Sequence, residues 1–262
     1  MDHKKLQGQL RLKILGLHHM AGSGHIGCSL SCIDMMISIL KFRDPADTFI
    51  LSKGHAATAL YTIMNEIGEI PDEAMDTFYK NGTTLPAHPV PLKYKAIPFA
   101  TGSLGHGMPL GTGIAKAKKL KGTDGISYVL MSDGETNEGT SWEAGHFAVT
   151  NKLDNLVVFV DKNGLQGFGS TQDILGDTAA ANKWEAIGFE VAEVDGHSIS
   201  AMVEAKEKLA ASKNGKPKMI IAHTVKGKGV PHMENKMEWH YLPMTEDMYT
   251  DAIKKINTDY GI

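Results

Sequence analysis

The sequence has few cysteines, no long apolar run and little net charge. Its two cysteines, Cys28 and Cys32, stand four residues apart in an apolar segment. That spacing places both on one face of a helix, so we expect buried thiols rather than a disulfide or a metal pair. Because no signal peptide and no membrane-spanning run is visible, we expect a soluble, cytoplasmic protein. A formal net charge of −3 gives no reason to expect nucleic acid or an anionic membrane as a partner.

Glycine and histidine, by contrast, are plentiful, with 28 glycines and 12 histidines. Several histidines stand in glycine-containing tripeptides, which end at His25, His55 and His106. Ordinary surface or core roles explain most histidines, but this repeated setting is harder to assign to them. These segments are therefore candidates for chemistry.

Apolar periodicity predicts helices that alternate with strands along the whole chain. Helical spacing occurs within 6–17, 30–40, 71–79, 110–120, 138–151, 179–187, 199–212 and the C-terminal segment, and a further helix follows the loop at 52–54. Strands are expected at 49–51, 126–132, 155–161, 188–194 and 218–224. Because these strands read as apolar throughout, we expect a parallel sheet with helices on both faces. The fold class is a doubly wound α/β domain, and residues 1–262 form a single domain; the strand order is not predicted.

Polar side chains follow two consecutive strands of this sheet. Asp133 and Asn163 each stand just after a strand, and in parallel sheets ligands bind beyond the carboxyl ends of the strands. Gly134 permits close approach, and the helix that begins near Glu138 directs free N–H groups to the same space. Asp-Gly after one strand is more often an ordinary turn. The pair of oxygen donors favours a Mg²⁺ ion that holds a diphosphate.

The segments "SDGETNEGTSWEA" and "DNLVVFVDKNGLQ" resemble the thiamine-diphosphate motif, in the form typical of transketolases. Further segments similar to that family are "SGHIG", "FILSKGHAATALY", "LPAHP", "ATGSLGHG" and "HTVKGKGVPHMENKMEWH", so the resemblance extends over nearly the whole chain. Two residues depart from the family pattern. Ser132 replaces the usual glycine, which the metal should tolerate, and Ile26 replaces a proline, which leaves the loop that carries His25 less rigid.

The resemblance implies a role for each matching residue. It implies metal ligation by Asp133, Asn163 and the backbone carbonyl of Leu165, with Mg²⁺ as the ion and Ca²⁺ or Mn²⁺ as alternatives. The residues implied in binding thiamine diphosphate are His55, Gly102, Ser103, Leu104, Gly134, Glu138 and Asn163. The implied catalytic residues are His25, His88 and His240, with His232 as a competitor for the last position.

The sequence leaves two possible roles open for each of three basic residues. A packing role for His106 is as plausible as a catalytic one. Lys226 and Lys228 could grip a phosphate or belong to a flexible basic surface loop.

In the family, a glutamate from a second, pyrimidine-binding domain completes the cofactor site, and this sequence stops at Ile262. Because the C-terminal segment reads as a finished helix, we expect the N-terminal subunit of a two-chain transketolase. Its partner would be a C-terminal, pyrimidine-binding subunit in an assembly such as α₂β₂. The implied reaction moves a two-carbon ketol unit from a ketose phosphate to an aldose phosphate.

Several alternatives remain open at this stage. The chain could belong to a specialised two-chain transketolase for an unusual sugar phosphate. It could instead resemble 1-deoxyxylulose-5-phosphate synthase or the α subunit of a 2-oxoacid dehydrogenase. A cofactor-binding paralogue without catalysis is the alternative outside the enzymes.

Overall fold

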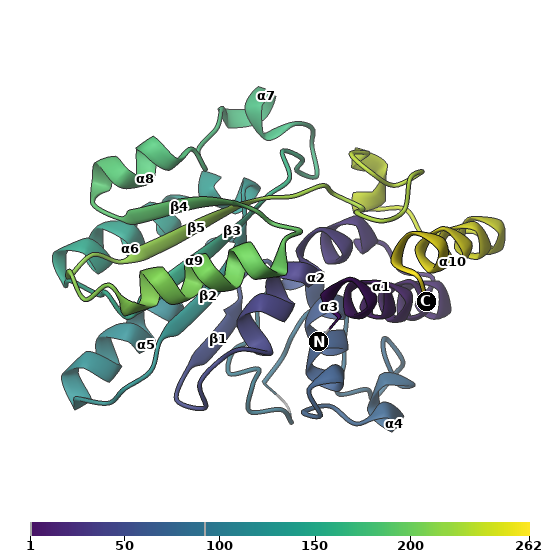
Figure 1. Cartoon of the computed structure of the whole chain (residues 1–262), viewed down its shortest axis with the longest axis horizontal. Helices are drawn as coiled ribbons and strands as arrows, with labels where there is room; N and C mark the ends of the chain where they lie inside the picture. The colour runs from purple at the N-terminus through teal and green to yellow at the C-terminus, as the bar shows by residue number, and fades with distance from the viewer. Residues whose placement is uncertain (1, 92) are drawn as a thin grey trace.

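The chain is described by a computed structural model that covers residues 2–91 and 93–262 (Figure 1). Within these residues, five parallel strands form one sheet in the order β1-β2-β3-β5-β4. The strands are β1 (Thr48–Leu51), β2 (Ser127–Ser132), β3 (Leu156–Lys162), β4 (Glu190–Asp195) and β5 (Lys218–His223). The doubly wound α/β fold predicted from the sequence is confirmed.

Helices precede, separate and follow the strands. They are α1 (His3–Ala21), α2 (Ile26–Leu40), α3 (Ala57–Glu66), α4 (Asp72–Met75), α5 (Gly107–Lys121), α6 (Gly139–Thr150), α7 (Thr171–Leu175), α8 (Ala181–Ile187), α9 (Ile199–Ala211) and α10 (Glu246–Tyr260). Short 3₁₀ turns are η1 (Gly54–Ala56), η2 (Gly134–Asn137) and η3 (Met237–His240). None of the described helices is long and apolar enough to cross a membrane.

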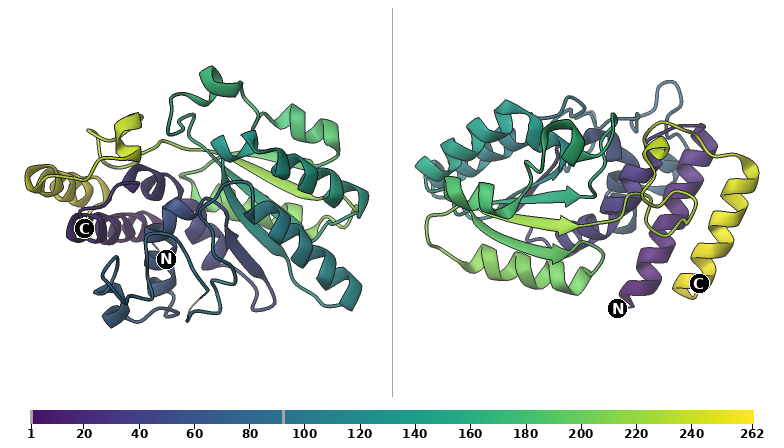
Figure 2. Two further views of the ribbon diagram at one scale, coloured as in Figure 1. Left: turned by 180° about the vertical axis from the view of Figure 1, so that it is seen from behind. Right: turned by 90° about the horizontal axis from the view of Figure 1, so that it is seen from above.

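The two faces of the sheet are covered by different sets of helices. On β3, Val158 and Val160 pack in one cluster with residues of α5, α6 and α8. Val157 and Phe159 point the other way and pack in a second cluster with residues of α1, α2, α3, α9 and α10. Helices α1 and α10 lie side by side at the end of the molecule that carries both termini (Figures 1 and 2). The alternation of a strand's side chains between two apolar layers explains why the central strands read as continuous apolar runs.

Two local predictions were wrong, and one short helix was missed. The strand at 188–194 is not apolar throughout: β4 is an edge strand, and its side chains are half-buried or exposed. The helix expected at 71–79 is confined to α4, because turns follow it and Tyr79 takes a left-handed conformation with φ of 60°. Helix α7 was not predicted, since its five residues are too few to show a period.

Candidate active site

The carboxyl ends of β2 and β3 lie next to each other, as the sequence predicts. The two strands pair in parallel with Ser132 opposite Asp161. Just beyond, the Asp133 carboxylate accepts hydrogen bonds from the backbone N–H groups of Gly134 (2.8 Å) and Gly164 (2.6 Å). These bonds fasten the carboxylate to the loop that carries Asn163. Asp133 and Asn163 therefore sit on two loops that are held together.

A cavity of about 330 Å³ opens over these strand ends. Its lining residues come from the start of α2, the connection between β1 and α3, the loop before α5, the loops that follow β2 and β3, and the segment around η3. Of the residues implied by the resemblance, those that line it are His25, His55, His88, Gly102, Leu104, Asp133, Gly134, Glu138, Asn163, Leu165 and His240. Ser103 does not line it, and its side chain is exposed. Phe168 (89% exposed) and Tyr241 (50% exposed) are also among the lining residues.

Four histidines face one another across the cavity. The ring centre of His25 lies 5.7 Å from that of His55, 6.3 Å from that of His88 and 5.1 Å from that of His240. Burial, with the neighbouring imidazoles, lowers the pKa of His25 to about 4. The pKa of His88 is lowered by burial and by His55. The lowered pKa favours the neutral form of His25 and His88, in which each ring can donate one hydrogen bond and accept another.

The structure separates the two candidates for the C-terminal histidine. His240 lines the cavity, whereas His232 does not and packs against Trp239 instead. His106 is exposed at the start of α5, where its ring hydrogen-bonds backbone carbonyls of its own loop, and it does not line the cavity.

Lys226 is a site residue whose placement the sequence left open. Its side chain is only 1% exposed, so a flexible surface loop is the wrong reading. The ammonium donates to His240 Nδ1 (2.9 Å) and lies 3.4 Å from the Leu165 carbonyl oxygen. Cys28 is buried as predicted but also lines the cavity. Burial alone would raise the pKa of its thiol, but His55, Lys226 and His240 hold it well below the ordinary value.

Beneath the cavity lies a buried ion pair that the motif does not reveal. The Lys53 ammonium contacts the Asp161 carboxylate, and both side chains are fully buried. Burial alone would raise the pKa of Asp161, but Lys53 and hydrogen bonds from Ser31 and Thr224 lower it. A lysine two residues after a buried strand is the only signal in the sequence that could have pointed to this pair.

Glu135 is a second buried group that the sequence did not single out. Its carboxylate accepts hydrogen bonds from Ser52 Oγ and from the backbone N–H of Gly105 (2.8 Å). Burial raises the pKa of Glu135 to about 7. Gly105 has φ of 81°, and a Cβ there would come within 2.5 Å of Thr140 Oγ1, so the position requires glycine. Glu135 thereby fastens the loop of Gly102 and Leu104 over the strand ends.

The residues present fit a divalent cation and a diphosphate. Burial and the nearby Asp161 raise the pKa of Asp133 to about 7, so a cation would stabilise its charged form. No group of three or more His, Cys, Asp or Glu side chains able to hold a metal occurs among residues 2–91 and 93–262. The donor set offered instead is one carboxylate, the Asn163 amide and a backbone carbonyl, which suits a metal that completes its shell with phosphate and water.

Two further details concern the wall of the cavity beside Gly134. A Cβ on this residue would lie 2.9 Å from Gln166 Cγ, so glycine is what allows the Gln166 side chain to lie against the backbone there. Within the part of the chain that the structure describes, Gln166 Nε2 is buried and has no hydrogen-bond partner. An unpaired buried donor beside a cavity is suited to an anionic ligand.

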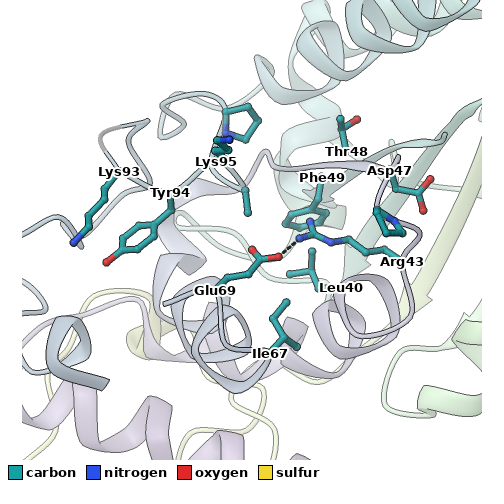
Figure 3. A pocket seen from close by; sticks show the side chains of 13 residues that line it. Leu40, Arg43, Asp47, Thr48, Phe49, Ile67, Glu69, Lys93, Tyr94 and Lys95 are labelled. Carbon is teal, nitrogen blue, oxygen red and sulfur yellow. Dashed lines mark hydrogen bonds and ion pairs between the residues drawn. The ribbon is translucent and has the colours of Figure 1, made fainter. Parts of the chain in front are cut away.

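A larger cavity of about 700 Å³ lies elsewhere, between the start of β1 and the segment 93–98 (Figure 3). Its central charged groups, Arg43 and Glu69, pair with each other. Because it opens beside the first residues of a parallel strand rather than beyond the last, it lies away from the usual ligand site of this fold.

Comparison with known proteins gives consistent matches. Residues 3–262 match the family model described as "Transketolase, thiamine diphosphate binding domain". The chain is 40% identical over 260 residues to an apulose-4-phosphate transketolase subunit of Actinobacillus succinogenes, covering 95% of this chain and 93% of that one. It is 37% identical over 249 residues to the 6-deoxy-6-sulfo-D-fructose transketolase subunit SqwG of a Clostridium species, covering 91% and 90%. A transketolase crystal structure from Pichia stipitis superposes with a TM-score of 0.90 at 27% identity, over 100% of this chain and 41% of that one.

Proposed function

Because the chain belongs to the transketolase family, we propose that it is the diphosphate-binding subunit of a two-chain transketolase. The observation that carries this proposal is the joined pair of strand ends, where Asp133 and Asn163 meet beneath a cluster of four histidines. The proposed reaction transfers a two-carbon ketol unit between sugar phosphates. We propose that the protein acts in the cytoplasm.

The residues proposed to hold the cofactor form the floor of the cavity. Asp133, Asn163 and the Leu165 carbonyl would hold Mg²⁺, and Gly134 would lie against the diphosphate. Lys226 and His55 would add donors toward the same anion, since one is a buried cation and the other a neighbouring imidazole. When bound, thiamine diphosphate supplies the electron sink for breaking and forming carbon–carbon bonds.

The histidines are proposed to act on the sugar. His25, His88 and His240 surround the open side of the cavity, where hydroxyl groups of a substrate would enter. The Lys226 ammonium donates to His240 Nδ1, so the ring proton of His240 stands on Nε2 and can be donated to a substrate oxygen. His25, with its pKa lowered to about 4 by burial and neighbouring imidazoles, has a free ring nitrogen that can accept a proton.

The relatives guide the choice of substrate. Their names give apulose 4-phosphate and 6-deoxy-6-sulfo-D-fructose as what those proteins act on. We therefore favour an unusual or modified sugar phosphate over the common pentose phosphates as the substrate of this chain.

A companion subunit would complete the site. The chain spans 41% of the Pichia transketolase, whereas it spans 93% of the Actinobacillus relative. We propose that the pyrimidine-binding domain, with its glutamate, stands on a second chain in an α₂β₂ assembly. Phe168 and Tyr241, both exposed at the cavity mouth, provide an apolar rim on which such a subunit would rest.

Reconstitution tests the proposal. The purified chain should show no ketol transfer alone, and adding the companion subunit with thiamine diphosphate and Mg²⁺ should restore it, measured with a panel of ketose and aldose phosphates. Full turnover by the chain alone would contradict the two-chain arrangement. Cofactor binding without transfer on any substrate, even with the companion, would favour the non-catalytic paralogue, whereas decarboxylation of a 2-oxoacid would favour the other thiamine-dependent enzymes.

A further inference from the structure

A buried charged cluster lies away from the cavity and joins three distant segments. Its members are Arg11 on α1, Asp34 on α2 and His197 in the turn after β4, and none of them lines the cavity. Arg11 and Asp34 are both 0% exposed, and Arg11 Nη1 donates to Asp34 Oδ1 at 2.8 Å. The other carboxylate oxygen lies 2.8 Å from His197 Nδ1. Burying the Arg11–Asp34 pair is costly, so its arrangement with the partly buried His197 calls for an explanation.

The hydrogen bonds of His197 determine where its proton stands. The backbone N–H of Val225 donates to His197 Nε2 at 2.9 Å, so this nitrogen must be the acceptor. The proton therefore stands on Nδ1 and is donated to Asp34. Burial alone would raise the pKa of Asp34, but Arg11 and the hydrogen bond from His197 hold it at about 2. Asp34 is thus a charged acceptor that fixes both the tautomer and the orientation of the ring.

The segment that His197 holds, residues 225–228, is also fixed at its other end. Arg11 Nε donates to the Lys228 carbonyl at 3.1 Å, and the Gly227 N–H donates to the Gly27 carbonyl at 3.1 Å. Gly227 has φ of 78°, and a Cβ there would come within 2.6 Å of the Met233 carbonyl oxygen. Hydrogen bonds to α1, α2 and His197 therefore fix the backbone of this segment.

We propose that Asp34 and His197 are positioning residues that hold segment 225–228 so that Lys226 points into the diphosphate pocket. This rests on the proposed function, because it assigns Lys226 to the cofactor diphosphate. A lysine is a flexible point charge, and aiming it from a mobile backbone would cost affinity for the anion. Fixing the residues on both sides of Lys226 removes part of that cost.

Two substitutions of His197 separate its two hydrogen bonds. In His197→Asn the amide nitrogen takes the place of Nδ1 and can donate to Asp34, but Val225 N–H loses its acceptor. In His197→Gln the amide oxygen takes the place of Nε2 and can accept from Val225. With the companion subunit present and Mg²⁺ saturating, we expect His197→Asn to weaken the binding of thiamine diphosphate about tenfold, the loss typical of a broken hydrogen bond. His197→Gln should keep most of the affinity, and equal weakening by both would overturn the proposal.

A double-mutant cycle tests whether His197 acts through Lys226. Lys226→Ala should weaken thiamine diphosphate binding, and adding His197→Asn to that variant should cost little more. If His197→Asn damages the fold in general, it should weaken binding by the same factor with Lys226 present and with Lys226→Ala. That result would overturn the proposal. An unchanged affinity in Lys226→Ala would also overturn it, although the proposed function would stand.

Amide hydrogen exchange gives a measurement without cofactor. In the full-length chain, His197→Asn should speed exchange at residues 225–228, while His197→Gln should stay close to the unsubstituted chain. Equal exchange in all three would overturn the positioning role. If the unsubstituted chain with its companion binds no thiamine diphosphate, the proposed function fails, and this exchange measurement still decides the positioning.

Discussion

Two buried carboxylates beneath the cavity are accommodated in different ways. Asp161 faces the Lys53 ammonium, which keeps the acid charged and its pKa low against the effect of burial. Glu135 has the Ser52 hydroxyl and two backbone N–H groups as its hydrogen-bond donors, and burial raises its pKa to about 7. Lys53 is therefore the main group that keeps Asp161 charged, whereas Glu135 is held chiefly by hydrogen bonds from neutral donors.

Removing that counter-charge should be costly. Lys53→Met leaves the Asp161 carboxylate buried without its cation, and we expect the free energy of unfolding to fall by about 3–5 kcal/mol. Urea denaturation checks this. Lys162→Met, which breaks a partly exposed pair with Asp177, is the matched control and should cost no more than about 1 kcal/mol. Similar losses in the two variants would contradict the assigned role of Lys53.

Asp133 allows a direct test of the proposed metal. Asp133→Ala removes the only carboxylate of the proposed ligand set, so Mg²⁺-dependent binding of thiamine diphosphate should weaken by on the order of 100-fold or more. Titration calorimetry with Mg²⁺ and with a chelator measures the effect. Asp177→Ala, which removes a carboxylate on a partly exposed side chain, should bind normally. Unchanged affinity in Asp133→Ala would place the metal elsewhere.

At the scale of the secondary-structure elements, the close packing of α5 on the sheet depends on a glycine. A Cβ at Gly111 would lie 2.3 Å from Val129 Cγ2 on β2, whereas a Cβ at Gly113 would meet nothing within 4 Å. Both residues are helical. The side of α5 that carries Gly111 therefore packs closely against β2, whereas the side that carries Gly113 does not contact the sheet.

The two glycines make a matched pair for measurement. Gly111→Ala should lower the free energy of unfolding by about 1–3 kcal/mol, because the methyl group overpacks the interface. Gly113→Ala should raise it by about 0.5–1 kcal/mol, because alanine favours the helix without a clash. Thermal or urea unfolding of both variants measures the two changes. Stabilisation by Gly111→Ala would show that Val129 and β2 shift to make room for the methyl group.

The elements and the strand-end pair could be predicted from the sequence because both depend on local patterns. Apolar runs located the strands, and the side chains just after them placed Asp133 beside Asn163. Lys226 could not be assigned, because the backbone on either side of it is bonded by Arg11 and His197, which stand more than two hundred residues and about thirty residues away in the chain. Ser103 was predicted to bind the cofactor, but its side chain faces solvent.

The departures from the family pattern have structural explanations. Ser132 Oγ accepts a hydrogen bond from the Glu135 N–H at 3.2 Å, so the extra side chain helps close the turn after β2. Ile26 is fully buried at the start of α2, where its side chain packs in the core. His25 just before it has φ of 68°, a conformation that a non-glycine residue keeps only when its surroundings hold it.

At the scale of the whole molecule, His18 and Asp34 each lose a stabilising contribution as the pH falls, in two separate ranges of pH. Burial lowers the pKa of His18 from 6.5 to about 4, so the unfolded chain takes up a proton there more readily. Stability from this residue is complete above pH 6.5 and is lost as the pH falls toward 4. Asp34, with its pKa held at about 2 against burial by Arg11, contributes stability that is lost only below its ordinary value of 3.8.

The first range can be measured with one substitution. Between pH 7 and pH 4.5, the unfolding free energy of His18→Gln should fall by about 2–3 kcal/mol less than that of the unsubstituted chain. Urea denaturation at the two pH values gives the difference. His146→Gln, at an exposed position on α6, should show the same pH dependence as the unsubstituted chain. An unchanged pH dependence in His18→Gln would mean that another group is responsible.

The exposed aromatic rings at the cavity mouth have a practical consequence. Phe168 is 89% exposed and Tyr241 is 50% exposed, beside a recess that reaches the strand ends. Uncovered aromatic surface of this kind promotes self-association as concentration rises. Yield, storage and crystallisation of the chain should therefore improve when it is produced in the same cells as the proposed companion subunit.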